Sequence, residues 1–216
     1  MDDREAKSKK DFDLEVVYHG FKNCMTEDGT VKLREYLDAF SELCRFFKLA
    51  GRIFAFIARD LDGKISIIRR HMSTDGEGDK YVTVQSMLCY EIECETTHKK
   101  GSFPSGTRTL LRLQRALEFI ITFMKQLAQG NDDASVRRIA SSVYGRTLSK
   151  HHPLIVRKMA AVVMYLLPNR RRLIEVMCKH EPDEVLVLTE RVLQVAYPAY
   201  DKIQELYSTN DLLNIP

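Results

Sequence analysis

The chain of 216 residues is long enough to bury a substantial core, and we expect residues 1–216 to form a single domain. Its composition, with 44% hydrophobic and 29% charged residues and only 10 glycines and 6 prolines, is typical of a helix-rich globular protein and excludes a disordered one. The net charge of +3 permits attraction to phosphate groups or anionic membranes, but it is too small to indicate nucleic-acid binding.

The five cysteines include no CxxC pair, so we expect reduced thiols in a cytosolic protein, without a metal site or another cofactor. No apolar run approaches the roughly 20 residues that span a bilayer. Any contact with a membrane is therefore expected to be peripheral.

Helical periodicity dominates the first part of the chain. Apolar residues recur at three- and four-residue steps over residues 12–25, 30–49 and 81–96, which predicts amphipathic helices. The turn signal EDGT separates the first two, and a polar loop at residues 73–80 precedes the third.

A helix expected over residues 52–71 carries charges in an unusual place. Asp60 and Lys64 fall within its apolar stripe, four residues apart, so their side chains can reach each other. A charge in an apolar stripe must be paired or must serve a ligand. A purely structural ion pair is the alternative to a binding role.

The segment at residues 105–127 predicts a core helix with a second notable face. Leucines and other apolar residues form one stripe, and Arg108, Arg112 and Arg115 lie opposite it at one-turn spacing. The same face continues into Phe119 and Phe123, so the arginines would stand at the mouth of an apolar space. The alternative is a solvated arginine face that runs under another helix.

The second half of the chain predicts four more helices. One spans residues 134–148 and follows Asp132 and Asp133, whose charges suit a helix N-terminus. The next, over residues 153–168, is nearly all apolar, and we expect it to be the most buried. A basic turn at residues 169–172 leads to a short helix ending at residue 180, and a long helix covers residues 182–207. The chain thus has about eight helices and an all-α, layered fold.

The common enzyme signatures are absent from the sequence. It contains no glycine-rich phosphate loop, HExxH motif or GxSxG elbow. His151 and His152 could act as a base or as part of a metal site, but capping or surface histidines are more common.

Five polar residues in unexpected places suggest a ligand instead. Arg108 and Arg112 offer forked donors to phosphate oxygens, and Lys64 adds a third cation. Asp60 can accept from a ligand N–H or O–H group, and His152 can donate to a carbonyl. Together they suit a head group that bears a phosphate, an amide and a hydroxyl.

Three segments carry a resemblance to a known family. FAFIARDLDGK at residues 54–64, SGTRTLLRLQRAL at residues 105–117 and HHPLIVRK at residues 151–158 resemble the glycolipid transfer protein superfamily, in its branch that carries ceramide-1-phosphate. The likeness covers essentially the whole chain. It implies an all-α, two-layer helical sandwich that encloses sphingolipid chains and moves ceramide-1-phosphate between membranes without catalysis.

The resemblance also implies roles for the five polar residues. Asp60 would bind the ceramide amide N–H and hydroxyl, His152 the amide carbonyl, and Lys64, Arg108 and Arg112 the phosphate. Glycolipid carriers of the superfamily have a tryptophan where this chain has Arg112 and an asparagine where it has Lys64. This chain has no tryptophan, so a platform for a sugar is missing.

A lipid carrier must also offer an apolar pocket, since exposing a lipid chain to water costs about 0.8 kcal/mol per CH₂. The candidate pocket residues are Phe47, Ile53, Phe56, Ile57, Phe119, Phe123, Val162 and Val163. Basic clusters at residues 69–70, 137–138 and 170–172 are candidates for contact with anionic membranes.

We therefore expect a monomeric cytosolic protein that associates reversibly with Golgi, plasma or other intracellular membranes. Three alternatives stay open at this point. One is a carrier of another sphingolipid such as a glycosylceramide, one is a helical interaction module, and one is an enzyme acting on a phospholipid head group.

Overall fold

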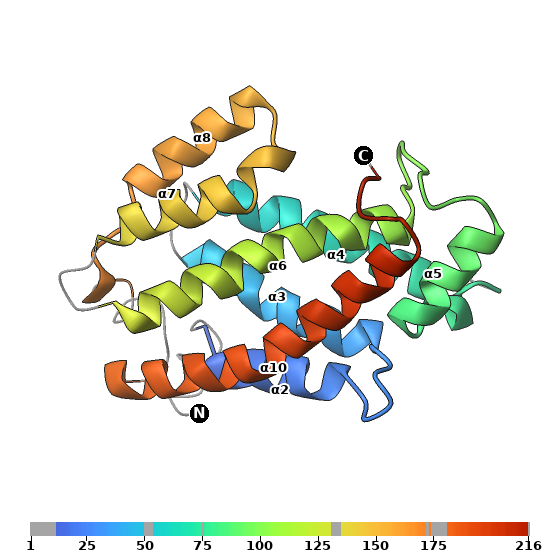
Figure 1. Ribbon diagram of the computed structural model, residues 1–216, viewed down its shortest axis with the longest axis horizontal. Coiled ribbons are helices and arrows are strands. Elements are labelled where there is room, and N and C mark those ends of the chain that lie inside the picture. The colour runs from blue at the N-terminus through green and yellow to red at the C-terminus, as the bar shows by residue number, and fades with distance from the viewer. Residues whose placement is uncertain are drawn as a thin grey trace, which may run out of the picture.

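The computed structural model describes residues 12–49, 54–74, 76–130, 135–171, 173 and 181–215. These residues form eight α-helices and two short 3-10 helices (Figure 1), namely α2 (Leu14–Cys24), α3 (Leu33–Leu49), α4 (Ala55–Met72), η1 (Gly78–Tyr81), α5 (Val84–Glu93), α6 (Gly106–Gln129), α7 (Val136–Arg146), η2 (Ser149–His151), α8 (Leu154–Tyr165) and α10 (Pro182–Thr209). The same residues contain no β-strand, which confirms the all-α prediction. None of their helices is both long and apolar enough to cross a lipid bilayer.

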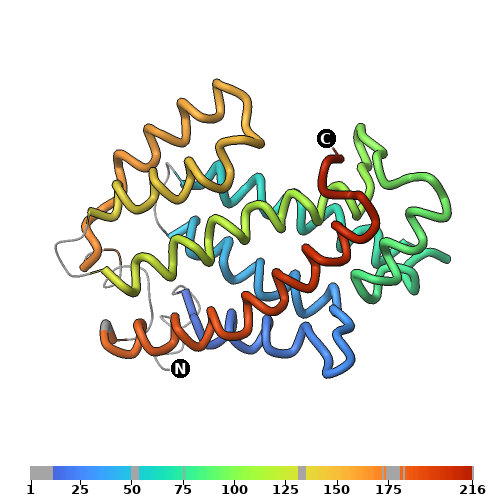
Figure 2. Tube along the Cα trace, in the orientation of Figure 1, coloured from blue at the N-terminus to red at the C-terminus, as the bar shows by residue number. Residues whose placement is uncertain are grey.

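Helix α6 lies at the centre of the arrangement. Helices α4, α5, α7 and α10 all pack against it, and α2 and α3 pack against each other beside α10 and α4. Figures 1 and 2 show α7 and α8 on one side of α6 and α2 and α10 on the other. Residues on different faces of α6 therefore meet different neighbours.

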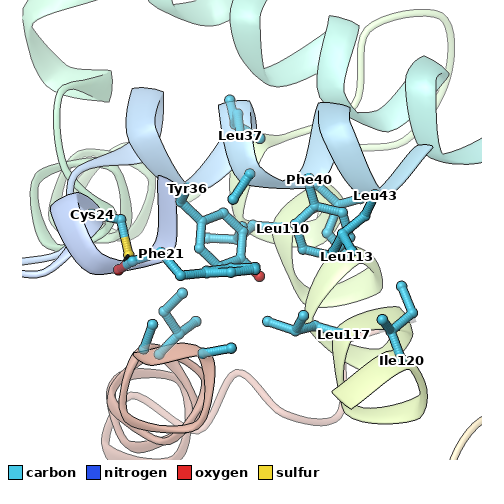
Figure 3. Packing of buried hydrophobic residues seen from close by; sticks show 14 of the residues in the cluster. Phe21, Cys24, Tyr36, Leu37, Phe40, Leu43, Leu110, Leu113, Leu117 and Ile120 are labelled. Atoms are coloured by element: carbon cyan, nitrogen blue, oxygen red, sulfur yellow. Dashed lines mark hydrogen bonds between the residues drawn. The ribbon is translucent and has the colours of Figure 1, made fainter. Parts of the chain in front are cut away.

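The main hydrophobic core fills the space between α2, α3, α4, α6 and α10. In Figure 3, Tyr36 and Phe40 of α3 face Leu113 and Leu117 of α6, and all four are fully buried. The Tyr36 hydroxyl donates to the side-chain oxygen of Gln114 at 2.7 Å, and the Gln114 amide donates to the carbonyl of residue 200 in α10 at 2.8 Å. This buried chain of hydrogen bonds fixes three helices relative to one another.

A second, smaller core lies between the C-terminal half of α6 and the α7–α8 pair. Phe123 of α6 packs there with Val143 and Tyr144 of α7 and Met164 of α8. Phe119 lies parallel to Phe123, with ring centroids 5.9 Å apart, and touches both cores. The predicted continuation of the arginine face into phenylalanines thus marks the boundary between the two cores.

Helix α8 corrects one prediction. We expected it to be the most buried helix, but only Val163 and Met164 of its twelve residues are buried. Leu154 and Ile155 are 73% and 70% exposed, because α8 packs mainly against α7 and no described helix covers its outer face. Apolar composition alone does not distinguish a buried helix from one that presents an apolar surface.

Some expectations fall outside the described residues. Asp132 and Asp133 do, as does nearly all of the short helix expected before residue 180. The end of the chain is clearer, because Leu212 and Ile215 are buried and the tail packs onto the main core.

Candidate functional site

The first turn of α6 is held in place by two side chains. The Ser105 hydroxyl accepts the backbone N–H of Arg108 at 3.2 Å, as predicted for an N-cap. The buried carboxylate of Glu91 in α5 accepts the N–H groups of Gly106 and Thr107 at 2.7 and 2.9 Å. All three contacts satisfy donors that a helix start leaves free, so the arginines that follow project from a fixed helix end.

A second charged element faces this helix from α4. The Lys64 ammonium forms an ion pair with the Asp60 carboxylate, as their four-residue spacing predicted. Lys64 is largely covered, whereas Asp60 is 66% exposed. Because α4 packs on α6, this pair stands beside the arginine face.

The electrostatics of Arg112 reflect this arrangement. Desolvation lowers its pKa most, the neighbouring charge of Arg108 lowers it further, and the Asp60 carboxylate acts in the opposite direction. Arg108 is partly covered, and its buried Nε has no hydrogen-bond partner among the described residues. The site therefore holds more positive charge than its own acidic groups compensate.

An apolar cavity of about 1130 Å³ begins at these charges. Its polar mouth is lined by Asp60, Lys64, Arg112, Arg115, His151 and His152. Its walls come from α3, α4, α6, α7, α8, the start of α10 and the tail, and include Phe46, Phe47, Phe56, Ile57, Phe119, Phe123, Met164 and Val185. The volume is typical of a ligand cavity rather than a packing defect.

Most of the predicted pocket residues line this cavity, namely Phe47, Phe56, Ile57, Phe119, Phe123 and Val163. The prediction for Val162 is wrong, because this residue is 56% exposed and lies on the outer face of α8. Ile53 lies outside the described residues. Arg108 lies near Arg112 but does not line the cavity itself.

His152 reaches the site from the opposite side. It follows η2, and its Nδ1 lies 2.9 Å from the Tyr144 hydroxyl of α7. Desolvation is the largest cause of its lowered pKa, so the ring is neutral near pH 7. The preceding His151 also lines the mouth, and desolvation followed by the charge of Arg115 lowers its pKa to about 4.

Two contacts of the site were missed in the sequence. Arg115 lines the mouth, as its position one turn after Arg112 indicated, but its donation to the Leu213 carbonyl at 3.0 Å was not expected. This contact brings the tail residues Leu213, Asn214 and Ile215 to the cavity wall. The contact of Tyr144 with His152 was not expected either.

This arrangement offers groups that can bind a ligand. Within the described residues, no three His, Cys, Asp or Glu side chains gather in a way that would hold a metal ion. The mouth offers several cationic donors, one carboxylate acceptor and two neutral imidazoles, and the interior offers mostly apolar contacts. Such a site fits an amphiphile whose head carries a negative charge.

Known proteins with similar sequences are lipid carriers by name. Residues 31–179 match the protein family described as Glycolipid transfer protein (GLTP). Ceramide-1-phosphate transfer protein from Danio rerio is 34% identical over 208 residues, which cover 95% of this chain and 98% of the relative. The protein of that name from Mus musculus is 34% identical over 223 residues and all of both chains.

Solved structures agree in fold. The mouse ceramide-1-phosphate transfer protein in its apo form has a TM-score of 0.89 and 33% identity, covering 95% of this chain and 100% of the other. The human protein bound to 2:0 ceramide-1-phosphate has a TM-score of 0.88 and 30% identity over the same shares. These neighbours confirm the expected two-layer helical architecture. The chain belongs to the glycolipid transfer protein family.

Proposed function

We propose that this protein carries ceramide-1-phosphate between membranes and leaves the lipid chemically unchanged. The observation that carries the proposal is the uncompensated cluster of cations at the mouth of an apolar cavity. Relatives named for this lipid, which match the whole chain, support it.

The proposed head-group roles are those that the family resemblance implies, and the grouping of charges at the mouth supports them. Lys64, Arg108 and Arg112 bind the phosphate, because charge-assisted bonds to an anion compensate the excess positive charge of the site. Asp60 accepts from the amide N–H and the hydroxyl, and His152 donates to the amide carbonyl. When the phosphate takes Lys64, the Asp60 carboxylate becomes free for the amide.

The cavity holds the hydrocarbon chains. Exposing one long chain to water costs on the order of 10 kcal/mol at about 0.8 kcal/mol per CH₂, and an apolar interior offsets most of this cost. Phe119 and Phe123 form one wall of that interior. Chain burial is indifferent to the head group, so selectivity comes from the mouth.

Charge gives that selectivity a physical basis. A neutral sugar head would desolvate Lys64 and Arg112 without pairing them, and unpaired buried charges are costly. The chain also has no tryptophan on which a sugar could stack. A glycosylceramide is therefore a poor cargo for this site.

The outer face of α8 is the surface that docks on the membrane. It exposes Leu154, Ile155 and Tyr165 beside the cavity, and the Arg137 guanidinium lies 4.5 Å from the Tyr165 ring centroid. Apolar insertion and nearby cations together give reversible binding to an anionic surface. By contrast Arg170, in another basic cluster, is buried and donates to the Leu127 carbonyl. The protein acts as a cytosolic monomer that visits Golgi, plasma or other intracellular membranes.

Transfer of fluorescent lipids between vesicles tests the proposal. The protein should move ceramide-1-phosphate rapidly, move a glycosylceramide much more slowly, and form no product. Lys64→Gln should reduce ceramide-1-phosphate transfer severalfold, whereas Lys80→Gln, an exposed lysine outside the cavity, should not. Equal transfer of both lipids would contradict the phosphate site, lipid turnover would favour an enzyme, and no transfer would favour an interaction module.

A further inference from the structure

Tyr144 and His152 form a polar pair within the cavity wall. Both residues line the cavity, and the tyrosine hydroxyl lies 2.9 Å from His152 Nδ1. Tyr144 is 8% exposed, and its ring packs edge-on against Phe119 with centroids 6.4 Å apart. Its hydroxyl makes no other hydrogen bond with a described residue, so its position is tied to the imidazole.

The main chain of His152 is also fixed. Its carbonyl accepts from Arg157 Nε at 2.8 Å, and its N–H donates to the carbonyl of Ser149 at 3.3 Å. The ring is therefore held by its own backbone and by Tyr144. Its second nitrogen, Nε2, has no hydrogen-bond partner among the described residues.

The protons in this pair can be assigned from what each group is able to do. Burial raises the pKa of Tyr144, so the phenol keeps its proton and is a donor. If Nδ1 carried the imidazole proton, the Tyr144 oxygen would accept from it, and the hydroxyl proton would then lack an acceptor among the described residues. The satisfied arrangement has the Tyr144 hydroxyl donating to Nδ1, which leaves the imidazole proton on Nε2.

We propose that Tyr144 is a positioning residue that holds His152 in the Nε2–H tautomer, as a donor for the carbonyl of the lipid amide. The identity of the ligand in this inference rests on the proposed function. The tautomer of His152 does not, because it follows from the contact with Tyr144. It predicts that the polarity of the amide site is set before lipid enters.

The position of the imidazole proton matters because an amide carries both a hydrogen-bond donor and an acceptor. Its N–H must meet an acceptor and its carbonyl must meet a donor. The Asp60 carboxylate is an acceptor only, and the locked His152 supplies the donor. An imidazole with its proton on Nδ1 would present a lone pair to the carbonyl, and both groups would then be left unpaired.

The charged groups around His152 do not select the tautomer in place of the Tyr144 hydrogen bond. Asp60 favours the protonated imidazole, whereas Lys64 of α4 and Arg157 of α8 disfavour it. None of these charges discriminates between the two neutral tautomers as directly as a hydrogen bond to one ring nitrogen does. Tyr144 is the group that makes that bond.

Nitrogen-15 NMR of histidine-labelled protein tests the tautomer without lipid. The chain has six histidines, and comparison with His152→Gln assigns the signals of His152. In the native protein the proton should reside on Nε2 near pH 7. In Tyr144→Phe the hydrogen bond that favours the neutral ring is lost, so His152 should titrate at a higher pH.

Vesicle transfer supplies the functional arm. Tyr144→Phe keeps the aromatic ring and should weaken ceramide-1-phosphate binding by about twofold to tenfold, the range expected for one neutral hydrogen bond. The matched control is Tyr197→Phe, which removes a tyrosine hydroxyl outside the cavity and should change neither readout.

The outcomes separate the two proposals. A proton on Nδ1 in the native protein would overturn the inference even if Tyr144→Phe failed to fold. Unchanged titration and unchanged binding in Tyr144→Phe would overturn it as well. A native protein that moves no ceramide-1-phosphate would instead refute the proposed function, whatever tautomer the spectrum reports.

Discussion

Replacing Arg112 by leucine should weaken lipid binding without destabilising the lipid-free protein. Arg112 lines the cavity mouth, where desolvation and then the charge of Arg108 lower its pKa. A hydrogen bond to a charged group contributes about 1.5–3 kcal/mol. Losing the bonds from Arg112 to the phosphate should therefore reduce affinity for ceramide-1-phosphate about 10- to 100-fold.

The same substitution removes a charge that desolvation and the neighbouring Arg108 disfavour. The guanidinium is only partly covered, so solvent screens this effect, and the free energy of unfolding should stay the same or rise by less than about 1 kcal/mol. Fluorescent lipid titration gives the affinity and urea unfolding gives the stability. Arg59→Leu, an exposed arginine of α4 outside the cavity, is the control. Affinity within twofold of the native value, or a clear loss of stability, would refute this reasoning.

Three further changes address the membrane, pH and packing. Ile155→Asp should reduce binding to anionic vesicles in flotation assays while leaving stability within about 0.5 kcal/mol. Val82→Asp, at an exposed valine outside both α8 and the cavity, should leave vesicle binding unchanged; equal losses of binding would point to a nonspecific effect. His151 has a folded-state pKa of about 4 against an ordinary value of 6.5, so its contribution to stability is present above pH 6.5 and falls as the pH drops towards 4. In urea unfolding, His151→Gln should lose less stability than the native protein between pH 6.5 and 4. If the two proteins lose the same stability over this range, burial of His151 does not lower its pKa. Gly20→Ala should destabilise the protein by about 1–3 kcal/mol in urea unfolding, because the added methyl would lie 2.7 Å from the Ala39 side chain; a neutral result would mean that α2 and α3 separate easily.

The arginine helix was predictable because its signals are local. Arg112 and Arg115 repeat at one-turn spacing, and Ser105 stands at the right distance to cap the helix. The ion pair of Asp60 with Lys64 is equally local, since four residues make one turn. Local patterns of this kind predict the helices and, where charged residues mark one side of a helix, the side that lies at the cavity mouth.

Contacts between distant segments had no comparable pattern. Arg115 meets the tail 98 residues later, and nothing in either segment indicates the other. Neighbouring valines in α8 illustrate a different limit. Val163 lines the cavity and Val162 faces outward, because one residue turns a helix by about 100°. In a helix that is apolar all round, the sequence does not indicate which face is inside.

The lipid-free protein keeps two arrangements that water disfavours. Inside, partly desolvated arginines adjoin an apolar cavity, and the buried Nε of Arg108 has no hydrogen-bond partner in the part of the chain that the structure describes. Outside, α8 presents Leu154 and Ile155 to solvent. Under the proposed function, a different contact removes each of these surfaces from water. The lipid phosphate and chains cover the cavity and its arginines, and the bilayer covers the outer face of α8. A carrier needs this division, because it must release its cargo at a membrane as well as hold it in water. If α8 docks while the cavity is open to the bilayer, the chains pass between two apolar surroundings of similar free energy, and only the bonds to the head group have to be exchanged.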